Sequence, residues 1–286
     1  MEKTLYVSDL DGTLLLPDRT IGAYTRETVS RLREKGLLFT AATARSIATA
    51  GPMLEGCNIS VPLILLNGAV IYDSVSKAYL DVRYFRPEIA DALLRRCGAL
   101  SRNVFVLTLP HLRREDGHGN AIDCWYRSLD TKFEKDFYAE REPMREYKRF
   151  LPTDSYTNIP RDRVIYFSMT GPEAEMRALR EEITGQYDVT TALYVDRYDE
   201  SNYFLEFAAP EASKKTAVTR LKALVGADRL VTFGDNTNDL GMFSASDVCC
   251  AVANAIPETK AAATVLIGSN VEEGVAHYLA EQFEGR

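Results

Sequence analysis

Several features that mark other protein classes are missing from this chain of 286 residues. No apolar run approaches the roughly 18 residues that span a bilayer, and the opening residues MEKTLYV lack the basic and long apolar segments of a signal peptide. The five cysteines have neither the paired spacing of a metal site nor the even count of a disulfide framework, so we interpret them as reduced thiols. We therefore expect a cytoplasmic protein.

An excess of basic residues is also missing. The net charge is -7 and the pI is near 5.2, whereas nucleic acids and anionic membranes both select a basic face. The sequence contains no GK dipeptide, no cysteine followed six positions later by arginine, and no GxGxxG. A P-loop enzyme, a cysteine phosphatase and a Rossmann dinucleotide enzyme are therefore unsupported. We expect a monomer or weak homodimer that binds a small molecule, with neither nucleic acid nor membrane as a partner.

Apolar runs that alternate with helical patterns occupy both ends of the chain. Helices are predicted over residues 25–35, with Thr25 as the N-cap, and over 213–225, which Gly226 ends. The runs expected to be buried strands are TLYVSD, LLFTAAT, VPLILLN and RLVTFGD. Continuous apolar strands separated by helices are typical of a parallel sheet that is covered on both faces. We therefore predict an α/β, Rossmann-like core formed by residues 1–84 and 208–286.

Residues 85–207, in the middle of the chain, have a different pattern of predicted helices and strands. An amphipathic helix is expected over 87–100, and it is followed by mixed strands, a charged stretch over 130–148 and a further helix over 172–184. This pattern indicates an inserted α+β domain.

Polar residues follow four of the predicted core strands. The strand ends read Asp9-Leu10-Asp11, Thr43-Ala44-Arg45, Asn67-Gly68 and Gly234-Asp235-Asn236. In an open parallel sheet, ligands bind beyond the carboxyl ends of the strands, so these groups should converge. Three carboxylates without a nearby His or Cys indicate a hard cation, which we take to be Mg²⁺.

The motifs DLDGTLL, a Thr after the second strand, a Lys that opens a helix in EASKKTAVTRL, and GDNTNDLGMF together resemble the haloacid dehalogenase superfamily of phosphohydrolases. The additional NGA, the late VANA and the position of the insert resemble its Cof-type subfamily with a class IIB cap. The second motif reads ATAR where that subfamily usually has ATGR, so Ala44 replaces a glycine close to the phosphate.

This resemblance implies a Mg²⁺-dependent phosphatase of small phosphorylated metabolites, with sugar phosphates as the first substrates to consider. Asp9 would attack phosphorus to give an aspartyl-phosphate, and Asp11 would act as general acid and then as general base. The metal would be held by Asp9, the backbone carbonyl of Asp11, and Asp235, with Asp239 behind them. The implied phosphate contacts are Leu10, Thr43, Ala44, Asn67, Lys214 and Asn238.

Some alternatives stay open. Lys215 competes with Lys214 for the phosphate, and Asn67 and Asn254 are equally well explained as turn residues. A phosphomutase shares the aspartyl-phosphate, and a catalytically idle phospho-ligand sensor would keep the fold. The insert is expected to act as a lid that selects the substrate, although a solvated hairpin loop explains its polar residues as well. Its candidate contacts are His111, Arg113, Arg114, His118 and Trp125.

Overall fold

The computed structural model describes residues 2–110, 121–196 and 199–284, and the chain divides into two compact units. Unit 1 consists of residues 1–81 and 213–286, and unit 2 of residues 82–212. The sequence predicted boundaries after residues 84 and 207. The first of these lies three residues after the corresponding boundary in the structure, and the second lies five residues before it. The last strand of unit 2 continues to Ala208 and is followed by a short turn, which accounts for the second difference.

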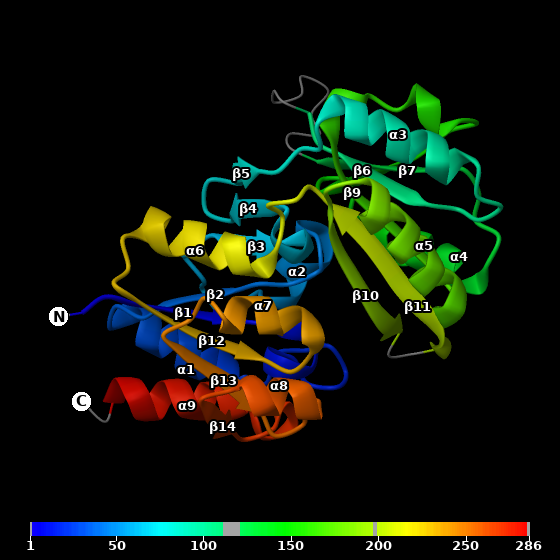
Figure 1. The fold of residues 1–286 in the computed structure, drawn as a ribbon. Helices are drawn as coiled ribbons and strands as arrows, with labels where there is room; N and C mark the ends of the chain where they lie inside the picture. The colour runs from blue at the N-terminus through cyan, green and yellow to red at the C-terminus, as the bar shows by residue number, and fades with distance from the viewer. Residues whose placement is uncertain (1, 111–120, 197–198, 285–286) are drawn as a thin grey trace. The chain divides into compact units, whose positions relative to one another are not determined.

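Unit 1 is built on a five-stranded sheet with the order β14-β13-β12-β1-β2 (Figure 1). All four pairings in this sheet are parallel. The strands are β1 (Thr4–Ser8), β2 (Leu38–Ala41), β12 (Arg229–Gly234), β13 (Val248–Val252) and β14 (Val265–Ile267). The helices are α1 (Ala23–Glu34), α2 (Ile47–Met53), α6 (Lys214–Val225), α7 (Leu240–Phe243), α8 (Pro257–Ala262) and α9 (Gly274–Glu284).

The chain leaves the centre of this sheet in two directions. From β1 it passes through α1 to β2 on one side, and from β12 it passes through α7 to β13 on the other. Because such crossovers are right-handed, α1 and α7 cover opposite faces; α9 packs against α1, and α6 against α7. The carboxyl ends of β1 and β12 thus lie at the point where the connections diverge, which is where open α/β sheets bind ligands.

Two predictions for unit 1 were wrong in part. The helix predicted from Thr25 begins at Ala23, because the carboxylate of Glu273 accepts the Thr25 backbone N–H at 2.6 Å and supports an earlier turn. The third predicted core strand, β3 (Leu63–Leu65), meets β2 only through one parallel bridge between Ala42 and Ile64. It belongs instead to a three-stranded sheet with β4 (Val70–Asp73) and β5 (Ala78–Val82).

Unit 2 contains a six-stranded sheet with the order β10-β11-β9-β6-β7-β8, antiparallel except between β7 and β8. Its strands are β6 (Phe105–Thr108), β7 (Ile122–Tyr126), β8 (Lys148–Pro152), β9 (Val164–Gly171), β10 (Thr190–Asp196) and β11 (Asp199–Ala208). Its helices are α3 (Pro87–Gly98), α4 (Lys132–Arg141) and α5 (Glu173–Gln186). The described elements therefore agree with the expected α+β pattern.

The two faces of the unit 2 sheet are covered differently. Apolar residues of α3 and α5 form the main core against one face, together with strand residues such as Phe167 and Phe207. Aromatic residues of α4 pack on strand residues that point the other way, for example Phe137 on Phe105 with ring centroids 4.6 Å apart. This second face also carries the buried side chains of Glu206 and Lys148.

Candidate active site

Asp9 follows β1 directly and is 5% exposed. Its backbone N–H donates to the carbonyl of Phe233 on β12 at 2.9 Å, which ties it to the neighbouring strand. The turn after it contains Gly12 at φ +83°, a conformation that glycine adopts without strain. Asn254 Nδ2 donates to the Gly12 carbonyl at 2.7 Å and fixes this turn from outside.

Lys214 provides a positive charge for two buried carboxylates. Its Nζ lies 2.5 Å from Asp9 Oδ1 and 2.7 Å from Asp239 Oδ1, and the residue is 2% exposed. Ser213 caps the helix that begins here, α6, and fixes the position of Lys214 in its first turn. The competing candidate, Lys215, is exposed, so the geometry favours Lys214.

The charges of this cluster shift the pKa values of its members. Burial alone would lower the pKa of Lys214, but the carboxylates of Asp239 and Asp9 outweigh it and raise that pKa above its ordinary value. Burial raises the pKa of Asp9 well above its ordinary value against the attraction of Lys214, and Asp239 and Asp235 raise it further. Asp9 is thus a buried carboxylate with more negative than positive charge around it.

A close turn after β12 adds Asp235, which is 4% exposed, to the cluster. Asp9, Asp235 and Asp239 each offer a carboxylate oxygen, and these oxygens lie within 4.8 Å of one another. Both oxygens of Asp239 are already engaged, Oδ1 by Lys214 and Oδ2 by the backbone N–H groups of Asp235 and Asn236 at 2.9 and 3.1 Å. Asp9 and Asp235 are therefore the better candidates for direct contact with a cation.

The donor set fits a divalent metal ion. When all four groups are ionised, the carboxylates of Asp9, Asp235 and Asp239 and the ammonium of Lys214 carry a net charge of two negative units. Burying this charge costs free energy unless a counter-ion is bound. All the candidate ligand atoms in this cluster are oxygens, which hard cations prefer. The cluster therefore fits a hard divalent cation.

Thr43, Ala44 and Asn67 come from neighbouring loops. Thr43 is 1% exposed and its carbonyl accepts the Asn67 backbone N–H at 2.9 Å, while Ala44 is half-buried. Asn67 Oδ1 faces Asn238 Nδ2 at 3.5 Å, at the limit of a hydrogen bond. The loops that carry Thr43, Asn67 and Asn238 therefore contact one another.

Gly68 lies where this loop touches the start of α6. A Cβ atom at Gly68 would come within 2.3 Å of the Ser213 carbonyl oxygen, and its φ of +99° disfavours any other residue. The preceding Leu66 and Asn67 also have positive φ angles, of +50° and +52°. The positive φ angles of the two residues that are not glycine, Leu66 and Asn67, are strained, which is typical of backbone held for a functional purpose.

Sequence reasoning missed Thr13 at the site, and it placed Arg45 at a strand end without giving it a role. Thr13 Oγ1 donates to Asp235 Oδ1 at 3.1 Å, and Arg45 forms two hydrogen bonds with the carboxylate of Asp11. The GT that follows Asp11 in the first motif, and the last residue of ATAR, were the available signals. Leu10, between the two aspartates, is fully buried, and its carbonyl accepts the Leu15 N–H at 2.9 Å.

Of the five substrate contacts predicted in the insert, the structure describes only Trp125. His111, Arg113, Arg114 and His118 lie outside the described residues. Trp125 packs against the main core of unit 2, and its Nε1 donates to Thr108 Oγ1 at 2.9 Å. The alternation along β7 points Trp125 toward the core on the side of α3 and α5, and its role as the wall of a substrate site stays a prediction.

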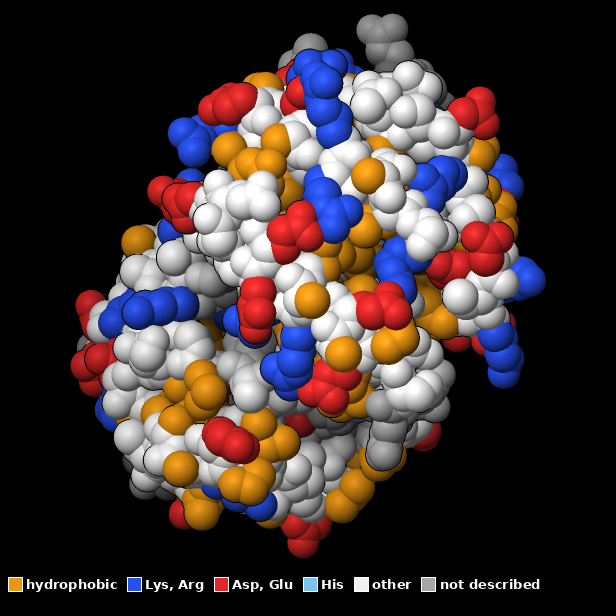
Figure 2. All heavy atoms as spheres, turned by 45° about the vertical axis from the view of Figure 1, so that its right-hand side comes forward, with side chains coloured by type: hydrophobic (Ala, Val, Ile, Leu, Met, Phe, Trp, Pro, Cys, Tyr) orange, Lys and Arg blue, Asp and Glu red, His pale blue; other side chains and the backbone are white. Residues whose placement is uncertain are grey.

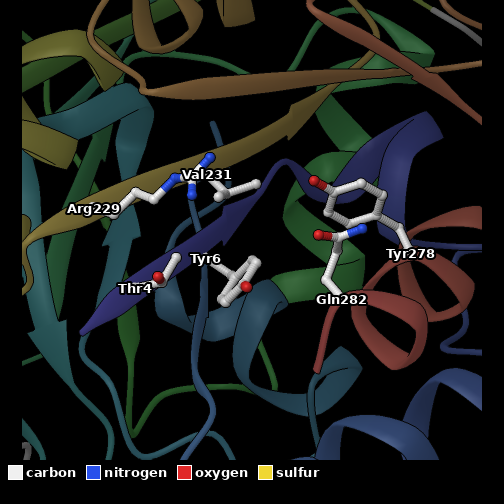
Figure 3. Close-up of a pocket in the computed structure, with 6 residues that line it drawn as sticks. All are labelled: Thr4, Tyr6, Arg229, Val231, Tyr278 and Gln282. Carbon is white, nitrogen blue, oxygen red and sulfur yellow. The ribbon is translucent and has the colours of Figure 1, made fainter. Parts of the chain in front are cut away.

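A small pocket in unit 1 lies at the opposite ends of the strands (Figure 3). Its lining includes Thr4 and Arg229, the first residues of β1 and β12, with Tyr278 and Gln282 of α9 beside them. Asp9 and Asp235 follow the other ends of these same strands. This pocket is therefore separate from the carboxylate cluster.

Comparison with known proteins agrees with this geometry. A family model described as haloacid dehalogenase-like hydrolase matches residues 6–279. The chain belongs to the haloacid dehalogenase-like hydrolases. The family predicted from the motifs is thus confirmed, and with it the α/β fold class and the assignment as a hydrolase.

Relatives of this hydrolase align over nearly the whole chain. It is 26% identical over 299 aligned positions to the 5-amino-6-(5-phospho-D-ribitylamino)uracil phosphatase YwtE of Bacillus subtilis, covering 97% of each chain. It is 23% identical to the pyridoxal phosphate phosphatase YbhA of Escherichia coli, covering 95% of each.

The fold matches that of solved hydrolases of the same family. A haloacid dehalogenase-like hydrolase from Bacteroides thetaiotaomicron gives a TM-score of 0.73 at 22% identity, covering 99% of this chain and 100% of the other. The subclass IIB sugar phosphatase BT4131 also gives 0.73, at 19% identity and 99% coverage of both.

Proposed function

We propose that this hydrolase is a Mg²⁺-dependent phosphatase that hydrolyses phosphate monoesters of small metabolites through an aspartyl-phosphate. The observation that carries the proposal is the buried Asp9 at the end of β1, bonded to Lys214 and close to Asp235. A carboxylate in this setting is suited to nucleophilic attack, because it is fixed in place and lies beside groups that can bind the phosphate.

The first half of the proposed reaction forms the intermediate. A carboxylate oxygen of Asp9 attacks phosphorus, and the bond from phosphorus to the leaving oxygen breaks. Asp11 gives its proton to that oxygen, so the product leaves as an alcohol. Lys214, Thr43 and Asn238 are proposed to bind the phosphoryl oxygens, together with the Asn67 side chain and the backbone at Leu10 and Ala44.

The second half regenerates the enzyme. Asp11, now ionised, takes a proton from water as the water oxygen attacks phosphorus. The bond between phosphorus and the Asp9 oxygen breaks, and inorganic phosphate leaves. Asp239 is proposed to hold Lys214 and the turn at Asp235 in place rather than to contact the phosphate.

Asp9, the Asp11 carbonyl and Asp235 would hold the Mg²⁺. When bound, the ion would neutralise negative charge and orient the phosphate for in-line attack. The net negative charge of the cluster supports a divalent ion, and the oxygen ligands support Mg²⁺ among the common ones.

Relatives supply the substrate classes to test first. Their names include phosphatases of a ribitylaminouracil phosphate and of pyridoxal phosphate, and one structural neighbour is a sugar phosphatase.

On the face that Figure 2 shows, acidic and basic side chains are interspersed, which supports a small ligand over a nucleic acid. A monomer or weak homodimer in the cytoplasm stays a prediction, and so does a substrate-selecting role for unit 2. No helix within the described ranges is long and apolar enough to cross a membrane.

The decisive experiment is a phosphate-release screen over sugar phosphates, nucleotides and cofactor phosphates, with and without metal. We expect turnover of at least one class with Mg²⁺, loss of that turnover with excess chelator, and inhibition by Ca²⁺, whose looser shell misplaces the nucleophile. Full turnover in chelator would contradict the metal assignment. Tight binding of phosphate esters without release would indicate the idle sensor.

A further inference from the structure

Arg45 forms a two-pronged contact with Asp11 that no proposed step uses. Its Nε lies 2.7 Å from Asp11 Oδ2 and its Nη2 lies 2.5 Å from Asp11 Oδ1. The Arg45 side chain is 14% exposed and that of Asp11 is 36% exposed, so the pair is only partly screened by solvent. Two parallel charge-assisted bonds fix both the position and the plane of a carboxylate.

The backbone of Arg45 is held as firmly as its side chain. Its N–H donates to Thr43 Oγ1 at 3.1 Å, and its carbonyl accepts the Leu66 N–H at 3.1 Å. The guanidinium therefore projects from a segment that is anchored to the loops of Thr43 and Asn67. Asp11 lies in the turn next to Gly12, whose backbone is held by Asn254 and by the bond from the Leu15 N–H to the Leu10 carbonyl, so Arg45 fixes the carboxylate on an already anchored segment.

The carboxylate of Asp11 is separate from the cluster that would bind metal. That cluster consists of Asp9, Asp235 and Asp239 among the described residues, and Lys214 binds two of its members. Lys214 therefore fixes the nucleophile, while a different cation from a different loop contacts the proposed acid and base.

Building on the proposed function, we propose that Arg45 is a positioning residue that fixes the carboxyl group of Asp11 for proton transfer to the leaving group and from water. A proton donor must lie within hydrogen-bond reach of the atom it serves, and a displacement of 1 Å can reduce the rate about 10²-fold. The fork of an arginine can hold both carboxylate oxygens at once, whereas a lysine offers a single point of contact.

The test compares leaving groups in single and double variants. In Arg45→Met we expect kcat/KM for an alkyl phosphate to fall about 10- to 100-fold. An aryl phosphate, whose leaving group needs little protonation, should lose less. Asp11→Asn should show the same preference for the aryl substrate. In the double variant, Arg45→Met should cost less than about threefold beyond Asp11→Asn, because the residue through which it acts is already lost.

Controls separate positioning from general damage. Arg33→Met removes an exposed guanidinium from α1 and should leave both substrates unaffected. Arg45→Lys should recover part of the alkyl phosphate activity, and thermal unfolding with and without Mg²⁺ reports whether the fold and metal binding persist. If Arg45→Met does not fold, Arg45→Lys and its double variant with Asp11→Asn provide the same comparison.

Three results would overturn the inference. The first is a double variant whose loss of kcat/KM equals the product of the two single losses. The second is an equal loss of kcat/KM on alkyl and aryl phosphates in Arg45→Met, and the third is an Arg45→Met enzyme with unchanged kcat/KM. The proposed function would stand in each of these cases, because the wild type would still release phosphate. A wild type that releases no phosphate from the whole panel would overturn both proposals.

Discussion

In unit 1 an ammonium group contacts the buried carboxylates of Asp9 and Asp239, whereas in unit 2 the buried carboxyl group of Glu206 contacts hydroxyl groups. In unit 1, Lys214 lies within 2.7 Å of both Asp9 and Asp239. In unit 2, Glu206 accepts hydrogen bonds from Tyr166 at 2.7 Å and from Ser168 at 3.4 Å. Both arrangements satisfy a buried oxygen, but only the first one places an ammonium group in direct contact with it, and burial still raises the pKa of Asp9 well above its ordinary value.

The pKa values of unit 2 follow from this difference. Burial raises the pKa of Glu206 to about 7, against its hydrogen bonds and the nearby Lys148. Burial also lowers the pKa of Lys148 to about 8. Glu206 and Lys148 are therefore each only partly ionised near physiological pH, while the pKa of Lys214 is raised and its charge is kept. The arrangement in unit 1 therefore keeps a charged ammonium group in contact with Asp9.

The largest effect should come from removing the nucleophile. Asp9→Asn keeps the size of the side chain but removes the attacking oxygen, so phosphate release should fall on the order of 10⁴-fold or more. The fold should persist, because Lys214 keeps Asp239 as a partner. Steady-state phosphate release together with thermal unfolding checks both statements. A variant that retains more than a few per cent of the wild-type rate would exclude Asp9 as the nucleophile.

The next effect should come from removing the ammonium group of unit 1. Lys214→Met leaves Asp9 and Asp239 buried without their cation, which should lower the free energy of unfolding by about 3–5 kcal/mol. We expect kcat/KM to fall by about 10²- to 10³-fold as well. The neighbouring Lys215 is exposed, so Lys215→Met should change stability by less than about 0.5 kcal/mol. Urea unfolding of the two variants makes the comparison, and similar losses in both would contradict it.

The smallest effect should appear in unit 2 and depend on pH. Between its ordinary pKa of 4.5 and its folded value of about 7, Glu206 holds its proton more tightly in the folded state. The free energy of unfolding of the wild type therefore falls as pH rises through this window, and the loss is complete above pH 7. Glu206→Gln removes this dependence and still accepts a hydrogen bond. The variant should match the wild type below pH 4.5 and be more stable at pH 8, by about 3 kcal/mol at most.

Trp125 makes this last prediction measurable. It is the only tryptophan of the chain and packs in the core of unit 2, so its fluorescence reports the unfolding of that unit. Glu181→Gln, on the exposed side of α5, is the matched control and should have little effect at either pH. If Glu206→Gln is equally stable relative to the wild type at both pH values, the pKa of Glu206 is not raised in the folded protein and the prediction fails.

The sequence by itself determined the family and the location of the candidate site. Asp9 and Asp235 were expected to converge at strand ends, and in the structure β1 and β12 pair with Ser8 opposite Phe233. Parallel strands bring their carboxyl ends to one edge whatever the loops do, so residues that directly follow a strand can be placed from the pattern alone. The chemical roles of these residues stay predictions.

Only the tertiary structure decided which side chains meet across distant loops. Arg45 binds Asp11 over 34 residues, and Thr13 binds Asp235 over 222 residues. The early start of α1 likewise depends on Glu273, and the direction of Trp125 on the pleat of its strand. Such contacts depend on loop conformation and on rotamers that packing selects, and neither leaves a periodic signal in the sequence.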